Sequence, residues 1–168
     1  MSGSLLPAAR SLLFTALVFS TAAAPAFARV GDPLARISER FGRSPERGSP
    51  KNMAVWFIES IDGALAYTVT VNAKGVSIAE GIKPIKRAIL TTKIAQDFLQ
   101  EQMSVYPDSK TARVVAPGEK YVFAQQSFVC AESEWVLLDE PNGLLLIWTR
   151  AGIPSVMAVS REMLLPKP

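Results

Sequence analysis

The sequence predicts an α+β fold, in which an antiparallel sheet of about five to six strands packs against one long helix. Residues 65–71 alternate between larger apolar side chains and Ala or Thr, which is typical of a strand with one buried face. Turn signals on both sides separate this segment from further apolar runs, as in a meander. Residues 85–103 instead carry apolar side chains at intervals of three and four, which indicates an amphipathic helix packed on a sheet.

Residues 29–51 are expected to form a short helix followed by a linker. Asp32 is the expected N-cap, Pro33 fits the first helical position, and Gly42 supplies the C-terminal stop. The apolar side chains between them share one face: Leu34, Ile37 and Phe41. Residues 43–51 are rich in proline, glycine and charge, so we interpret them as a linker.

A meander is expected after the linker. Asp62 and Gly63 give a strong hairpin signal, and residues 72–75 provide a second reversal. These turns separate three strands, at residues 53–60, 65–71 and 76–80.

After the helix at 85–103, strands are expected at residues 119–130, 135–138 and 144–149. Residues 140–143 have proline second and glycine fourth, as a type I turn prefers. Both faces of residues 144–149 are apolar, which fits either a central strand or an interface. Residues 153–164 fit helical spacing or a strand, and we favour a helix. The order is helix, three strands, helix, three strands, short terminal helix, with a single α+β domain over residues 52–168.

Residues 1–28 have the three zones of a secretory signal peptide. Arg10 precedes an apolar run at residues 11–24, and Ala26-Phe27-Ala28 matches an A-x-A cleavage site before Arg29. The apolar run is shorter than the roughly 20 residues that span a membrane, although an uncleaved anchor is the alternative. We expect cleavage after Ala28, a periplasmic or secreted protein, and no stable membrane insertion.

The composition excludes several kinds of chemistry. The 168 residues include no histidine and a single cysteine, Cys130. These counts exclude Ser-His-Asp and Cys-His catalysis, histidine-ligated metals, intramolecular disulfides and CxxC redox pairs. Neither a phosphate-binding glycine loop nor a calcium loop occurs. We therefore expect no catalytic residues, no cofactor and no metal, and hence a protein that is not an enzyme.

The charge balance is close to neutral, and one basic cluster stands out. The full chain has 18 basic and 15 acidic residues, and removing the segment with Arg10 leaves 17 and 15. This small excess argues against a nucleic-acid partner. Lys83, Lys86 and Arg87 cluster at the start of the expected long helix, where the helix dipole disfavours cations. The cluster predicts contact with an anion or an acidic partner; the alternative is a solvated helix surface.

Cys130 has two interpretations. A lone cysteine in an exported chain can form an intermolecular disulfide with a second copy, which would make a homodimer. The alternative is a buried cysteine acting as a small hydrophobe, and the acidic neighbours Glu132 and Glu134 disfavour a reactive thiolate. With Asp139 and Glu140 these carboxylates form either a solvated acidic rim or a hydrolytic pair.

Aromatic side chains are expected mainly in the core. Trp56, Trp135 and Trp148 all fall in expected strands, where an aromatic side chain is more often core than ligand site.

Two short motifs and the order of the expected elements resemble those of known groups of exported proteins. The short helix ends in RFGRSP, and after the meander and helix a tryptophan is followed by GLLLIWTR. This layout resembles small exported bacterial α+β proteins of uncharacterised role and, more distantly, the small two-layer domains of outer-membrane assembly accessory proteins. The chain departs from the accessory domains because it lacks their lipidated cysteine. The resemblance implies export and an α+β fold, and it implies no catalytic residue.

These observations favour an exported, non-enzymatic module that binds a protein of the cell envelope or the medium, through an apolar strand such as residues 144–149. One alternative is an inhibitor of an extracellular hydrolase, which would insert residues 43–51 or the turn at 140–143 into its target. Another is a small hydrolase that uses carboxylates.

Overall fold

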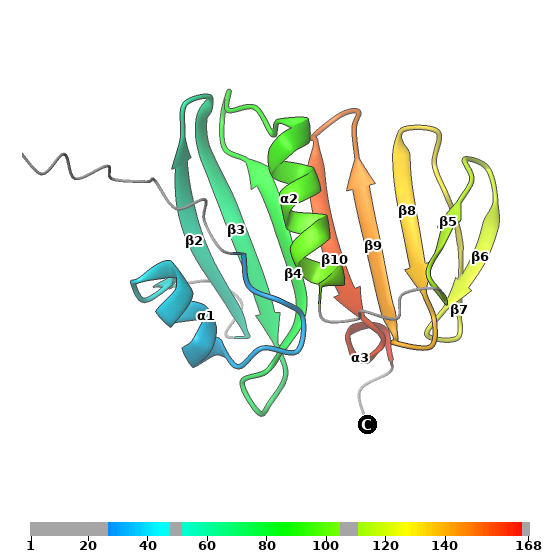
Figure 1. Ribbon diagram of the computed structural model, residues 1–168, viewed down its shortest axis with the longest axis horizontal. Coiled ribbons are helices and arrows are strands. Elements are labelled where there is room, and N and C mark those ends of the chain that lie inside the picture. The colour runs from blue at the N-terminus through cyan, green and yellow to red at the C-terminus, as the bar shows by residue number, and fades with distance from the viewer. Residues whose placement is uncertain (1–26, 48–51, 105–110, 166–168) are drawn as a thin grey trace, which may run out of the picture.

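The computed structural model describes residues 27–47, 52–104 and 111–165, so the expected signal segment before Phe27 lies outside it. Its main sheet has eight strands, paired antiparallel throughout, in the order β1-β2-β3-β4-β10-β9-β8-β5 (Figure 1). The strands are β1 Glu46–Arg47, β2 Met53–Ser60, β3 Gly63–Val71, β4 Ser77–Pro84, β5 Arg113–Val115, β8 Glu134–Asp139, β9 Leu144–Thr149 and β10 Ser155–Ser160. The separate hairpin is β6 Lys120–Phe123 and β7 Gln126–Val129, and the helices are α1 Leu34–Phe41, α2 Thr92–Met103 and α3 Arg161–Leu164.

The α+β class and the antiparallel sheet are confirmed, although the described residues form more strands than expected. Two meanders, β2-β3-β4 and β8-β9-β10, build the sheet, and their last strands meet at its centre. Ile82 of β4 lies opposite Val156 of β10, which in turn lies opposite Trp148 of β9. One side-chain face therefore continues from one meander into the other.

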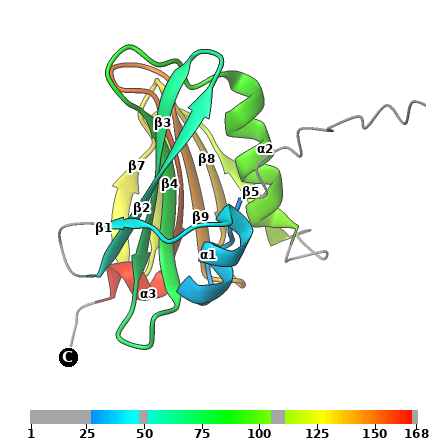
Figure 2. The same ribbon diagram turned by 90° about the vertical axis from the view of Figure 1, so that its left-hand side faces the viewer.

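Both longer helices cover the same face of the sheet, which we call the helical face (Figures 1 and 2). Trp56, Tyr67 and Phe98 are fully buried there, and Phe41 of α1 stacks on Trp56 with ring centroids 5.0 Å apart. Burial of side chains of this size contributes about 2 to 3 kcal/mol each, so this layer forms the main core.

The opposite face carries a smaller core under the β6-β7 hairpin and α3 (Figure 2). Tyr121 stacks on Phe128 across the hairpin at 5.5 Å, and Leu138 and Leu145 project onto this side from the main sheet. Strand β9 thus has a core on each side, and Leu144 and Leu145 are each 2% exposed. Of the two alternatives for residues 144–149, the structure has the central strand. Residues 144–146 are buried, whereas Ile147, Trp148 and Thr149 are only half-buried.

The expected helix at 85–103 is wrong over residues 85–91, because α2 begins only at Thr92. Strand β4 continues to Pro84, and the Ile85 N–H donates to the Ala64 carbonyl at 3.0 Å. Lys86 then adopts φ 57°, a left-handed conformation that breaks any helix. The helix starts only after Thr91, whose side chain accepts from the Ile94 N–H at 3.3 Å as an N-cap.

Two further segments differ from expectation. Residues 119–130 are a hairpin instead of one strand, because Ala124 and Gln125 both adopt positive φ and reverse the chain. The helix expected over residues 153–164 is wrong for most of its length, since 155–160 form the strand β10 and only Arg161–Leu164 are helical. The alternation of Val156 and Ala158 toward the core is the signal that prevails.

The first helix is confirmed, with Gly42 in the left-handed conformation as its C-cap. Asp32 is not its N-cap, which is Pro33. The Asp32 carboxylate instead accepts from the Arg29 N–H at 3.1 Å and pairs with Arg40 at 3.0 Å. The expected linker is only partly irregular, since β1 pairs with β2, and residues 48–51 lie outside the described chain.

Candidate functional site

Four surface openings of similar volume, between ≈ 330 and ≈ 370 Å³, are lined by described residues. Volume therefore does not single out a site. The chemistry of the lining does, because a binding site needs exposed apolar surface together with polar groups that are not already satisfied within the fold.

The opening between α2 and strands β8 and β9 has the most apolar lining, and we call it the tryptophan groove. It holds ≈ 330 Å³ and is lined by Gln96, Leu99, Trp135, Trp148 and Arg150. Trp135 and Trp148 lie directly opposite each other on neighbouring strands, and both are half-buried. Helix α2 packs on β10, and Figure 1 shows that it does not extend over β8. The sheet surface beside the helix is where Trp135 and Trp148 line the groove.

The mouth of the groove carries polar groups with unused bonding capacity. Arg150 is exposed, and its guanidinium makes no ion pair with another described residue. Gln96 is exposed on the second turn of α2. A guanidinium beside two indoles can bind a carboxylate while the indoles receive an apolar group.

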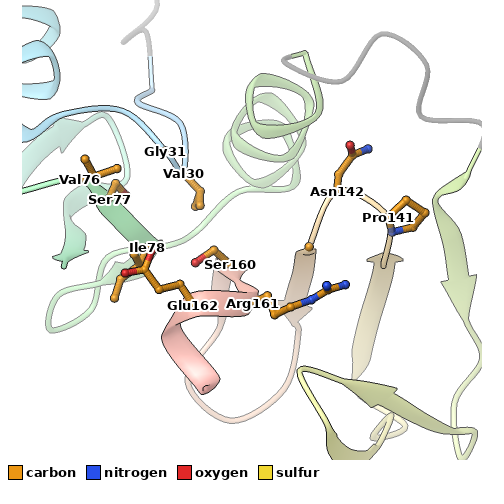
Figure 3. A pocket seen from close by; sticks show the side chains of 11 residues that line it. Val30, Gly31, Val76, Ser77, Ile78, Pro141, Asn142, Ser160, Arg161 and Glu162 are labelled. Atoms are coloured by element: carbon orange, nitrogen blue, oxygen red, sulfur yellow. The ribbon is translucent and has the colours of Figure 1, made fainter. Parts of the chain in front are cut away.

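The opening in Figure 3 lies at the end of the sheet where β10 passes into α3. Its polar side chains mostly bind protein groups: Arg161 donates to the Glu140 carbonyl at 2.6 Å, and Asn142 donates to Asp139 at 2.8 Å. The Ser160 hydroxyl is buried without a partner among the described residues. With its charges bound internally, this opening has less to offer a ligand than the tryptophan groove.

A third opening, lined by Phe27 and one side of α2, contains the carboxylates of Asp97 and Glu101. Lys93 pairs with Asp97 at 2.6 Å, and Arg29 pairs with Glu101 at 2.8 Å. A glycoside-cleaving pair needs one carboxyl that holds a proton, which a neighbouring cation opposes. These two acids therefore do not resemble such a pair.

The basic cluster predicted from the sequence does not lie at a helix start. Lys83 is on β4, and Lys86 and Arg87 are in the turn that follows, several residues before α2 begins at Thr92. Lys83, Lys86 and Arg87 are all exposed, so none of the three is enclosed by the fold. The argument from the helix dipole therefore does not apply to them, and the alternative of a solvated basic surface is favoured.

Cys130 is 1% exposed in the small core. Burial raises the pKa of its thiol, and the carboxylates of Glu134, Glu119 and Glu132 raise it further. This environment agrees with the interpretation as a small hydrophobe. A disulfide between two copies stays a prediction that would require the β6-β7 hairpin to open.

A buried polar network at the centre of the helical face escaped the sequence reasoning. The Glu80 carboxylate accepts hydrogen bonds from the hydroxyl of Tyr67, from Ser77 at 2.8 Å and from the Gln102 amide at 3.1 Å. Glu80 is 2% exposed, and burial raises its pKa. The Gln102 amide also donates to the Ala28 carbonyl at 2.7 Å. The network therefore joins β3, β4, α2 and the segment before α1 without opening onto solvent.

The tryptophan groove was also missed, although the sequence contained a signal for it. A turn over residues 140–143 pairs Asp139 with Leu144, and that register places Trp135 opposite Trp148. What the sequence could not show is where α2 ends relative to these indoles, because that depends on packing between the two layers.

Comparison of the chain with protein-family models, with curated proteins and with solved structures found no significant match. Among the residues that the structure describes, no cluster of acidic or cysteine side chains could hold a metal ion. No described helix has both the length and the apolar character to cross a membrane.

Proposed function

We propose that this chain is an exported, non-enzymatic binding module of the cell envelope that holds a segment of a partner protein in the tryptophan groove. The observation that carries the proposal is the pair of half-buried indoles, Trp135 and Trp148, beside the exposed Arg150, which has no ion-pair partner among the described residues. Tryptophan and arginine are the residue types that dominate protein-protein binding energy when a partner covers them.

The chemistry of the groove defines the segment that it would accept. An apolar or aromatic side chain would displace water from both indoles and from Leu99. A carboxylate next to that side chain would pair with Arg150, and Gln96 can bind a backbone amide. The expected partner is therefore a peptide segment with an aromatic or large aliphatic residue beside Asp, Glu or a C-terminal carboxylate.

Export rests on a separate argument. The apolar run at residues 11–24 followed by small residues supports a cleaved signal peptide, as derived above. A periplasmic or secreted location would give the groove access to envelope proteins.

Neither alternative function gains a comparable observation. For the hydrolase, the expected carboxylates are Glu132, Glu134, Asp139 and Glu140. Glu132 and Glu140 are exposed, whereas Glu134 accepts from the Ala131 N–H at 3.1 Å and Asp139 accepts from Asn142 at 2.8 Å. Of the four, only Glu140 lines one of the openings described above. For the inhibitor, Glu46 and Arg47 are paired into the main sheet, so the first part of the 43–51 segment is held against β2.

The test is selection from a displayed library of random peptides on the immobilised wild-type chain, after which each enriched peptide is measured for binding to the Trp148→Ala variant. We expect enriched peptides that combine an aromatic or aliphatic residue with a neighbouring carboxylate. Because the Trp148→Ala variant could misfold, a second variant, Arg150→Glu, changes an exposed side chain of the same groove. It is also expected to abolish binding.

Matched controls come from the same chain. Arg87→Glu makes the same charge reversal at an exposed position away from the groove, and Phe57→Ala removes an exposed aromatic from the other face of the sheet. Both are expected to keep the affinity of the wild type. Enriched peptides that ignore Trp148 and Arg150, or a lack of any enrichment, would overturn the proposal.

A further inference from the structure

Phe27 and Ala28 belong to the folded domain. Phe27 is 4% exposed and Ala28 is fully buried. The Phe27 ring lies 6.0 Å from the Tyr67 ring in a stacked arrangement and 5.8 Å from the Phe98 ring, edge to face. These two residues therefore contribute to the main core, at the point where α1, α2 and the sheet meet.

The backbone carbonyls of Phe27 and Ala28 also accept hydrogen bonds from the folded domain. The Phe27 carbonyl accepts from Arg40 at 3.0 Å, and the Ala28 carbonyl accepts from the Gln102 amide at 2.7 Å. Arg40 also forms an ion pair with Asp32, and the Gln102 amide also donates to Glu80. Cleavage after Ala28 would remove both carbonyls and the aromatic ring, and it would leave an apolar cavity in the core.

Cleavage at a second peptide bond would keep Phe27 and Ala28 in the mature chain. Signal peptides end in small residues at the first and third positions before the bond that is cut. Ala24 and Ala26 meet this requirement for the bond between Ala26 and Phe27, just as Ala26 and Ala28 do for the bond before Arg29.

We propose that the processing site is the peptide bond between Ala26 and Phe27, so that the mature chain begins at Phe27. A signal peptidase would hydrolyse this bond with one water molecule, which leaves a carboxylate on Ala26 and an amino group on Phe27. This inference rests on the export part of the proposed function.

The surroundings of Phe27 suit a new amino terminus. The opening alongside it is lined by the carboxylates of Asp97 and Glu101. The α-amino group of a mature chain is protonated over most of the physiological pH range. The protonated amino group of Phe27 would therefore lie beside a surface opening lined by two acidic side chains, which also pair with Lys93 and Arg29.

The test is the intact mass of the full chain after export to the periplasm, with the first residues read by N-terminal sequencing. Ala24→Leu changes the third position before the Ala26–Phe27 bond but lies too far from the bond before Arg29 to affect it. Ala23→Leu adds the same side chain one position earlier, where neither bond is affected, and serves as the matched control.

We expect a mature wild-type chain that begins at Phe27, a loss of processing at least tenfold in Ala24→Leu, and normal processing in Ala23→Leu. A mass beginning at Arg29, or unchanged processing of Ala24→Leu, would overturn the inference and leave export intact. A full-length chain found only in the cytoplasmic fraction would overturn export as well, whereas the peptide selection tests the tryptophan groove separately.

A comparison of thermal stability tests the structural role of Phe27 and Ala28 independently. Two exported versions, one beginning at Phe27 and one at Arg29, differ only in the two core residues. The shorter version is expected to have a Tm lower by roughly 10 °C, since it loses a buried aromatic ring. Equal Tm values would contradict a structural role for Phe27.

Discussion

Replacing Glu80 by glutamine is expected to remove a pH-dependent penalty from the folded state. Burial raises the pKa of Glu80 above its ordinary value of 4.5, so the folded chain still holds this proton at a pH where the unfolded chain has released it. The free energy of unfolding of the wild type therefore falls as pH rises through the window between the two pKa values. With one proton involved, the slope is about 1.4 kcal/mol per pH unit.

The Glu80→Gln variant fits the existing hydrogen bonds. Its new amide oxygen can accept from Tyr67 and Gln102, and one N–H of its new amide can donate to the Ser77 hydroxyl oxygen, so contact with all three neighbours is kept. The assay is urea unfolding at steps across the acidic to neutral range, with Glu132→Gln as an exposed control. The difference between Glu80→Gln and wild type should grow with pH and then level off. Parallel curves would refute the reasoning.

Three further predictions concern single positions. Gly63→Ala should lower the free energy of unfolding by about 2 kcal/mol, because Gly63 has φ 106° and a Cβ there would lie 2.8 Å from the Ala88 Cβ. Urea denaturation measures this difference, and an unchanged unfolding midpoint would contradict it. Thr91→Ala should lower the free energy of unfolding by about 1 kcal/mol, since the Ile94 N–H loses the side chain that caps it. Thr91→Ser keeps a hydroxyl at this position and should retain most of that stability. Cys130 should react with a thiol reagent only in denaturant, and rapid labelling of the native chain would show that the thiol is exposed.

Local chemistry was enough to predict the first meander, the hairpin of β8 and β9, and the first helix. Alternation in residues 65–71 and the turn over residues 140–143 each act within a few positions, so pairing follows directly from them. The hairpin at 119–130 lacks such a local signal. Ala124 and Gln125 are not typical turn residues, yet they adopt positive φ because the flanking strands pair and pack on the sheet.

Longer-range packing decided the segments that were mispredicted. Residues 85–91 have helical spacing, but β4 is held in the sheet by β10 on one side and β3 on the other, and the strand therefore runs on to Pro84. The candidate site depends on the same effect. The register of Trp135 and Trp148 follows from the turn, whereas their partial exposure follows from where α2 lies on the sheet.

The central claim is that Trp148 and Arg150 bind a peptide segment. The most direct measurement is the affinity, by isothermal titration calorimetry, of wild type, Trp148→Ala and Arg150→Glu for the most enriched displayed peptide, with Phe57→Ala as control. Loss of a central anchor costs about 2 kcal/mol or more, so the account predicts a Kd weaker by roughly 30-fold or more in both groove variants. Equal affinities in all four proteins would contradict it.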